Sequence, residues 1–308
     1  MLKLGTHYIY HSFIVSVNNV IGGKDLMKKR VAFVVDSTVY LTDELRHHPD
    51  IYVVPQIIIA NNKELEDGID IQTEELYEII QNSKDVPKTS QPNVGKFAQL
   101  YDKLKEEYES AIAIHVSSKL SGTLQSSTTG KNESGFAVEV VDSSSLSYGI
   151  THLLELGLSL VEKNMDYVEI AKVLREESKK GRNLILLGTL EQLYKGGRMT
   201  GIQFVLGNLL NIKPILTINE NGELVLKERI RSDKKATRRM IELLKETCEK
   251  YSVKKVAVMH GNALEKAKEI KKIIQNEIPG IKTLIGDISS SLAVHAGGGA
   301  VAIFWFQN

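Results

Sequence analysis

Side chains with hydroxyl groups gather in two short segments of the sequence. Thr89-Ser90-Gln91-Pro92 precedes a predicted helix, and Ser117-Ser118-Lys119-Leu120-Ser121-Gly122-Thr123 follows an apolar run that ends at Val116. Helix caps and turns account for some of these residues, because Ser, Thr, Gly and Pro are favoured there. Capping one helix needs one hydroxyl, however, and the second segment holds four within seven residues. Hydroxyl groups beside the amino-terminal amides of a helix form a neutral cradle that suits an anion.

Two segments in the second half of the chain add a cation and an imidazole. They are Gly196-Gly197-Arg198 and Val294-His295-Ala296-Gly297-Gly298-Gly299. Glycine lets the backbone turn sharply or approach a ligand closely. Each segment alone is also typical of ordinary structure, namely a turn with a solvated arginine and a structural histidine. Their interest lies in the combination with the two hydroxyl-rich segments.

Several familiar chemistries are absent from the sequence. It has no glycine-rich phosphate loop of the P-loop or Rossmann type, no His-Glu-x-x-His motif and no Gly-x-Ser-x-Gly nucleophile elbow. Cys248 is the single cysteine, which excludes an internal disulfide and zinc sites built on paired cysteines. We therefore expect no metal and no cofactor.

Composition is that of a globular protein. The 308 residues are 42% hydrophobic and 25% charged, and 39 basic against 38 acidic side chains give a net charge of +1. Whole-molecule attraction to nucleic acid or to an anionic membrane is not expected at that charge. The apolar run at residues 13–17 is too short for a signal peptide or a membrane span. We expect a cytoplasmic protein without stable membrane insertion, in which residues 1–28 form a poorly ordered extension.

Hydrophobic periodicity predicts the elements that position these segments. Strands are expected at residues 31–35, 52–54, 57–60, 111–116 and 137–141, with helices at 73–81, 94–108, 122–130 and 147–163. The second half predicts helices at 167–180, 234–250 and 263–275, and strands at 184–187, 213–218, 223–228, 255–259, 283–285 and 300–305.

This alternation defines the fold class. In the first half it indicates parallel strands with crossover helices. The turn at residues 219–222 predicts an antiparallel pair in the second half. We therefore predict a two-domain α/β protein, with a parallel-sheet domain at residues 29–165 and an α/β domain with a mixed sheet at residues 166–308.

Taken together, the order and spacing of these segments resemble the DegV family of bacterial fatty-acid-binding proteins over residues 28–306. The family usually has proline where this chain has Gly298, and the residues before Met27 have no counterpart in it. The matching stretches also include Asp36-Ser37-Thr38, Val141-Asp142-Ser143, Tyr194-Lys195 before the two glycines, and Leu210-Asn211-Ile212-Lys213-Pro214.

The resemblance implies a lipid-binding subunit that holds one long-chain fatty acid and has no catalytic machinery of its own. It places the carboxylate against Thr89, Ser121, Arg198 and His295, with a supporting loop of Ser90, Ser118, Gly122 and Thr123. Candidate walls for the alkyl tail are residues 202–210 and 215–218, which suit an ordinary core equally well.

The resemblance also implies a partner, an ATP-binding fatty acid kinase subunit that converts the presented carboxylate to an acyl phosphate. Residues 227–239 hold seven basic and two acidic side chains, a local charge of +5, and we expect Arg231 and Lys235 to contact that partner. A solvated helix face explains the same charges equally well. Nucleic acid is not an expected partner, because aromatic residues for base stacking are not interleaved.

Two other functions stay open at this point. One is a serine-dependent lipid hydrolase or acyltransferase, with Ser121 as nucleophile, His295 as base and Asp36 or Asp142 orienting the histidine. The other is a regulatory or nucleic-acid-binding module that acts through residues 227–239.

Overall fold

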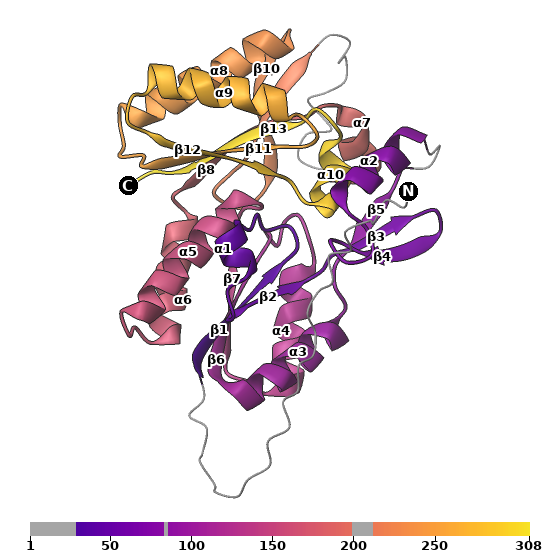
Figure 1. Cartoon of the computed structure of the whole chain (residues 1–308), viewed down its shortest axis with the longest axis vertical. Coiled ribbons are helices and arrows are strands. Elements are labelled where there is room, and N and C mark those ends of the chain that lie inside the picture. Colours follow the sequence, from indigo (N-terminus) through magenta and orange to yellow (C-terminus); the bar gives the residue numbers. More distant parts are fainter. Residues whose placement is uncertain (1–28, 83–85, 199–211) are drawn as a thin grey trace, which may run out of the picture.

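Three β-sheets organise the residues that the computed structural model describes, which are 29–82, 86–198 and 212–308 (Figure 1). The predicted α/β class, with one parallel and one mixed sheet, is confirmed. The expected extension at residues 1–28 and the candidate tail wall at residues 202–210 lie outside the described residues.

The first sheet is fully parallel and has the strand order β2-β1-β6-β7. Alternate residues of the central strand β1 enter different cores: Phe33 and Val35 pack on one face, Ala32 and Val34 on the other. Such two-sided burial is typical of parallel strands. The strands are β1 (Lys29–Asp36), β2 (Ile51–Val54), β6 (Tyr108–His115) and β7 (Val138–Asp142).

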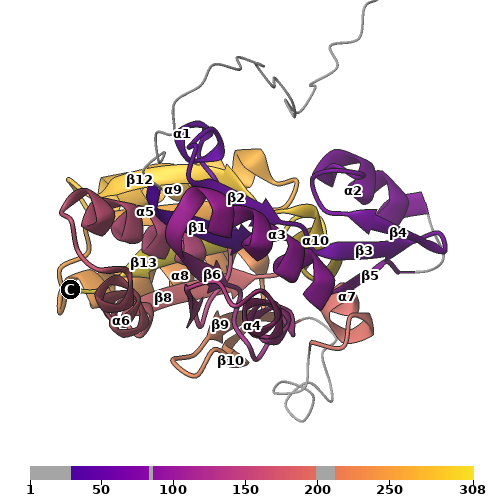
Figure 2. The ribbon, with the colours of Figure 1, turned by 90° about the horizontal axis from the view of Figure 1, so that it is seen from below.

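Helices cover both faces of this sheet (Figure 2). On one side lie α3 (Val94–Glu107) and α4 (Thr123–Ser134), and on the other α5 (Tyr148–Glu162) and α6 (Tyr167–Ser178). Ile170, Ala171 and Leu174 of α6 belong to the same core as α5 and β1. Since α6 packs on the parallel sheet, we propose that the division between the two domains falls after α6, at residues 179–180, instead of at 165–166.

The second sheet has six strands in the order β10-β9-β8-β13-β11-β12. Only β11 and β12 are parallel neighbours, and the hairpin predicted from the turn at residues 219–222 joins β9 to β10. The strands are β8 (Gly181–Leu186), β9 (Lys213–Ile218), β10 (Leu224–Ile230), β11 (Lys255–His260), β12 (Lys282–Asp287) and β13 (Val301–Phe306).

The two faces of this sheet have different partners. Helices α8 (Asp233–Cys248) and α9 (Leu264–Glu277) cover the outer face, where Ile303 and Trp305 of β13 enter their core. Ala302 and Phe304 alternate with these residues and point to the inner face, as expected for a strand. The inner face therefore looks toward the rest of the molecule (Figure 1).

A small antiparallel sheet, in the order β4-β3-β5, was not predicted. The strand expected at residues 57–60 leaves the parallel sheet because Asn61 and Asn62, both with positive φ, form a two-residue hairpin loop to the next strand. The strand at Lys88–Ser90 is short and polar, so hydrophobic periodicity does not reveal it. The strands are β3 (Ile57–Ala60), β4 (Lys63–Glu66) and β5 (Lys88–Ser90).

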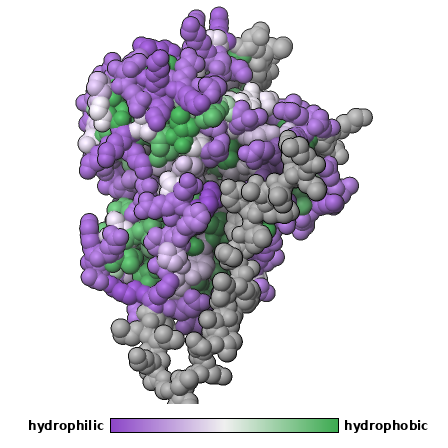
Figure 3. Space-filling model, in the orientation of Figure 1, coloured by the Kyte–Doolittle hydropathy of each residue, from purple (hydrophilic) through white to green (hydrophobic). Residues whose placement is uncertain are grey.

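The small sheet lies beside helices α2 (Thr73–Asn82), α7 (Leu190–Lys195) and α10 (Ser290–Ala296) (Figure 1). Helix α1 (Asp43–Arg46) lies between β1 and β2 in the chain. Of these helices only α2 was predicted, because the others span seven residues or fewer. Hydrophilic side chains cover most of the face seen in Figure 3. Among the described residues, no helix is long and apolar enough to cross a bilayer.

Candidate ligand-binding pocket

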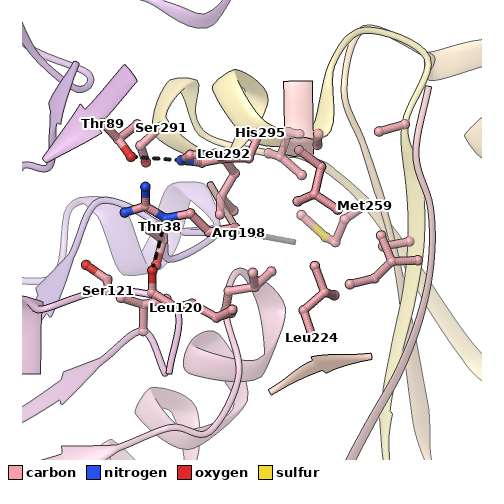
Figure 4. Close-up of a pocket in the computed structure, with 18 of the residues that line it drawn as sticks. Thr38, Thr89, Leu120, Ser121, Arg198, Leu224, Met259, Ser291, Leu292 and His295 are labelled. Carbon is pink, nitrogen blue, oxygen red and sulfur yellow. Dashed lines mark hydrogen bonds between the residues drawn. The ribbon is translucent and has the colours of Figure 1, made fainter. Parts of the chain in front are cut away.

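A pocket lies where the three sheets meet, and its two ends differ in chemistry (Figure 4). Polar side chains gather at one end, whereas Met259 and Leu224 lie at the other. The small residues Ala300 and Ala302 on or beside β13 leave room along the inner face of the six-stranded sheet. Further apolar side chains complete the wall, among them Ile185, Leu187, Leu193, Ile288, Leu292 and Phe304.

The tail walls expected from the sequence differ from this wall. Ile215 enters the core beneath α8 and α9, and Leu216 packs with Leu187 and Leu193 behind the pocket. None of residues 215–218 lines the pocket itself. The pleat of β9 explains the difference, because its side chains alternate between the outer core and the layer behind the wall.

The structure brings the four predicted carboxylate-binding residues to the same end of the pocket. Each comes from a different element. Thr89 lies on β5, Ser121 in the loop before α4, Arg198 just after α7 and His295 on α10. Thr89 Oγ1 and His295 Nε2 are 2.8 Å apart, so the small sheet and α10 meet through their hydrogen bond.

His295 is held in a neutral state. Burial, with the positive charge of Arg198 as a second cause, lowers the pKa of His295 to about 4. Its Nδ1 atom is buried and has no hydrogen-bond partner among the described residues. The backbone of Gly196 packs against the same ring so closely that any side chain at position 196 would collide with it. This contact explains the first glycine of the Gly-Gly-Arg segment.

Arg198 supplies the positive charge at this end of the pocket. Its Nη1 donates to the carbonyl oxygen of Gly196 at 2.8 Å, and its Nε donates to that of Leu120 at 3.4 Å. The second bond crosses from the second domain to the hydroxyl-rich loop (Figure 4). Among the described residues, no acidic side chain pairs with Arg198, so its charge is available to an anion in the pocket.

The loop before α4 supports Ser121 from behind. Ser121 Oγ lies 2.8 Å from Thr123 Oγ1 and accepts the backbone N–H of Thr123 at 3.3 Å. Thr123 is fully buried and also accepts a hydrogen bond from Gln56 Nε2 at 2.7 Å. Gly122 lies against the side chain of Gln91.

None of the four predicted supporting residues lines the pocket itself, although Gly122 and Thr123 lie next to Ser121, which does. Ser118 is exposed, and its backbone N–H donates to Asp142 at 3.3 Å. The Ser90 hydroxyl donates to the carbonyl oxygen of Gln91 at 3.5 Å. Successive side chains of an extended segment point to opposite sides, which directs Ser90 away from the pocket that Thr89 lines.

The pocket also contains polar residues that sequence reasoning missed, namely Gln56, Gln91 and Ser291. Ser291 belongs to the unpredicted helix α10. Gln56 follows Pro55 at the end of β2, where nothing in the sequence marks it as functional. Thr38, from the Asp-Ser-Thr stretch after β1, lines the pocket and donates to the buried Asp36 at 2.6 Å.

The contacts do not assemble a serine-hydrolase relay among the described residues. Asp36 faces His115 at 3.3 Å, and Asp142 accepts backbone N–H groups of its own neighbourhood. Burial alone raises the pKa of Asp36, but the contact with His115 and the hydrogen bonds from Thr38 and the Val116 amide outweigh it and lower that pKa. His295 therefore has Thr89 as its partner in place of Ser121 or a carboxylate.

The basic segment, residues 227–239, runs from the second half of β10 into the first half of α8. Arg239 is paired with Glu228 and Glu246, which consumes part of the local charge. Arg231 and Lys235 are exposed, and neither makes a side-chain ion pair with another described residue. Fewer unpaired positive charges therefore lie on the surface at this end of α8 than the seven basic residues of the segment would suggest.

We also searched the described residues for side chains that could bind a metal ion. Within the described part of the chain, no group of three or more His, Cys, Asp or Glu side chains is arranged to hold a metal ion.

Comparison with known proteins gives one consistent family. The DegV family model, described as an uncharacterised protein of that family, matches residues 30–308. A DegV domain-containing protein of Clostridium acetobutylicum is 36% identical over 284 residues, which cover 91% of this chain and 100% of the relative.

Solved structures agree. A fatty acid binding DegV family protein from Streptococcus agalactiae superimposes with a TM-score of 0.85 at 28% sequence identity. The match covers 91% of this chain and 99% of the Streptococcus agalactiae chain. A DegV family protein from Thermus thermophilus, described as fatty acid binding, superimposes with a TM-score of 0.84 at 27% sequence identity. That match covers 91% of this chain and 100% of the Thermus thermophilus chain.

Proposed function

The chain belongs to the DegV family, and on that premise we propose that it binds one long-chain fatty acid in the pocket between the sheets. Two relatives of similar fold and more than a quarter identical sequence are described as fatty acid binding. The observation that carries the proposal is the pocket itself, which has a polar end and a long apolar wall. That division matches a molecule with one carboxylate and one alkyl chain.

The polar end supplies donors for a carboxylate. In our proposal the hydroxyl groups of Thr89 and Ser121 donate to the carboxylate oxygens. The positive charge of Arg198 balances the negative charge of the carboxylate. His295 is neutral, and its Nδ1 has no partner among the described residues, so the proton is best placed on Nε2, where Thr89 accepts it. The Thr89 proton is then available to the ligand. Hydrogen bonds to a charged group contribute about 1.5–3 kcal/mol each.

The apolar wall supplies most of the affinity. Roughly fifteen buried methylenes at about 0.8 kcal/mol each give about 12 kcal/mol before the cost of association. A chain of about 14–18 carbons provides that number of methylenes. The head site therefore determines orientation, and the wall determines affinity and chain preference.

We further propose that the bound carboxylate is presented to a separate ATP-dependent kinase, which forms an acyl phosphate. The family resemblance and the missing phosphate loop support this division of labour. Arg231 and Lys235 offer exposed positive charge for docking such a partner. The proposal involves no metal or cofactor.

The competing function is an esterase or acyltransferase that uses Ser121. The hydrogen bonds favour the carrier, because Ser121 is bonded to Thr123 and His295 is bonded to Thr89. A nucleophilic serine needs a base within hydrogen-bond reach.

Native mass spectrometry of the full-length chain purified from bacteria tests the proposal. We expect one fatty acid of about 14–18 carbons per chain. Leu224→Glu, which puts a charge against the alkyl chain, should abolish occupancy. Val225→Glu, at the neighbouring position on the opposite face of β10, should retain it. Wild-type protein that is lipid-free and takes up neither palmitate nor oleate would refute fatty acid binding.

A further inference from the structure

We propose that Gln56 is a positioning residue that acts through Thr123 and makes the Ser121 hydroxyl a dedicated hydrogen-bond donor toward the pocket. This inference rests on the proposed function, since it assumes that the ligand places an ionised carboxylate at the polar end. It assigns a role in carboxylate selection to a side chain that the sequence did not single out.

Gln56 is firmly placed by its backbone. Its N–H donates to Ser37 Oγ at 3.0 Å, and its carbonyl oxygen accepts the N–H of Asp67 at 2.9 Å. The residue is only 4% exposed and still lines the pocket. Its Nε2 lies 2.7 Å from Thr123 Oγ1, which joins the end of β2 to the start of α4.

The direction of the next hydrogen bond follows from this contact. An amide NH₂ group can only donate, so Thr123 Oγ1 accepts from Gln56. Thr123 is fully buried, and a buried hydroxyl proton without an acceptor is costly. Its available acceptor is Ser121 Oγ at 2.8 Å. The order of donation is therefore Gln56 to Thr123 to Ser121.

Ser121 receives two hydrogen bonds and keeps one proton to give. Its Oγ accepts the Thr123 hydroxyl and also the Thr123 backbone N–H at 3.3 Å. A hydroxyl oxygen has two acceptor sites, so both are filled. The Ser121 proton then points into the pocket, where an ionised carboxylate, which only accepts, is the matching group.

Removing the Gln56 donor should undo this order. In Gln56→Met the side chain keeps its length, but Thr123 Oγ1 loses the donor that holds it beside Ser121, so the Ser121 proton is no longer fixed toward the pocket. We expect the affinity of the delipidated protein for palmitate to fall about fivefold to tenfold, the loss of one hydrogen bond of about 1–1.4 kcal/mol.

A double-mutant cycle separates this role from a direct or structural one. Palmitate Kd is measured for wild type, Gln56→Met, Ser121→Ala and the double variant. If Gln56 acts through Ser121, Gln56→Met weakens binding in wild type and adds nothing in Ser121→Ala. An equal loss in both backgrounds would overturn the relay. Gln125→Met is the matched control, because exposed Gln125 donates to Thr129 at 3.4 Å away from the pocket.

A reversal experiment adds a readout that a structural role would not produce. In Gln56→Glu an ionised carboxylate accepts from Thr123, whereas the protonated acid donates to it as Gln56 does. The palmitate affinity of Gln56→Glu is compared with that of wild type at each pH, because both proteins carry the same Arg198 and His295. Burial raises the pKa of the introduced carboxyl, and the relative affinity should recover as pH falls through that pKa. A constant ratio across pH would contradict the relay.

The two proposals fail differently. Wild-type protein that binds no palmitate refutes the proposed function. Wild-type binding with additive losses in the cycle refutes the relay alone.

Discussion

The Thr89 hydroxyl and the His295 Nε2 atom lie 2.8 Å apart, although 206 residues separate them in the sequence. One belongs to the small antiparallel sheet and the other to α10, which packs at the inner side of the six-stranded sheet. The polar end of the pocket therefore exists only in the complete fold. Neither domain contains it alone.

The neutral state of His295 should make the fatty-acid-free protein sensitive to mild acid. The unfolded chain takes up a proton near the ordinary pKa of 6.5, whereas the folded protein does so only near 4. Stability should therefore fall as pH drops from 6.5 to 4, by about 3 kcal/mol at the lower end. Urea unfolding of wild type and His295→Gln across this range measures it, and parallel profiles for the two proteins would contradict it.

Ser121→Ala should separate occupancy from presentation. The variant loses one charge-assisted hydrogen bond, about 1–3 kcal/mol, against a tail contribution several times larger. We expect the protein to retain fatty acid while kinase-dependent acyl-phosphate formation falls much further. A hydrolase predicts instead that wild-type Ser121 reacts with a serine-directed phosphonate and that the variant loses ester turnover. Stoichiometric labelling at Ser121 with real turnover would favour that alternative.

Reversing the charges of Arg231 and Lys235 to Glu should affect the partner and not the lipid. Both side chains are exposed and away from the pocket wall, so fatty acid occupancy should stay unchanged. Coupling to the kinase should weaken, and in wild type it should fade as salt rises, because exposed charges are screened beyond about 8–10 Å. Equal loss of lipid and of coupling would show that the segment is structural.

Glu177 should contribute stability that depends on pH in the acid range. A hydrogen bond with His152 at 3.0 Å, aided by Lys180, lowers the pKa of Glu177 from 4.5 to about 2. Its contribution, on the order of 2–3 kcal/mol, is present above pH 4.5 and lost as pH falls toward 2. Glu177→Gln should lower stability at pH 7 and flatten the acid transition. Glu176→Gln, at an exposed ion pair with Lys179, should change little.

Long apolar runs made much of the fold predictable. The run at β1 gave a central parallel strand, because strands buried on both faces are continuously apolar. Strand β5 and helix α10 escaped prediction for the opposite reason. Lys88–Ser90 is polar and three residues long, and Ser290–Ala296 spans seven residues, so neither carries a periodic signal. Both obtain their stability from tertiary packing.

The candidate site was predictable only in part. Thr89, Ser121, Arg198 and His295 came from the family resemblance and not from any local rule, because each alone fits a cap, a turn or a core. Gln56 illustrates what was missing. Its role depends on a contact with Thr123, 67 residues away, which periodicity and motif spacing do not encode.

Because the pocket wall is drawn from all three sheets, a bound fatty acid would touch each of them and act as an added piece of the core. A ligand that binds only the folded state stabilises it by about 2.7 kcal/mol at a hundred times its Kd. The lifetime of the protein in a cell would then follow the supply of its ligand. Pulse-chase measurement should show slower degradation in cells fed oleate, with no such effect for Leu224→Glu. Equal half-lives with and without oleate would refute this link between lipid supply and protein abundance.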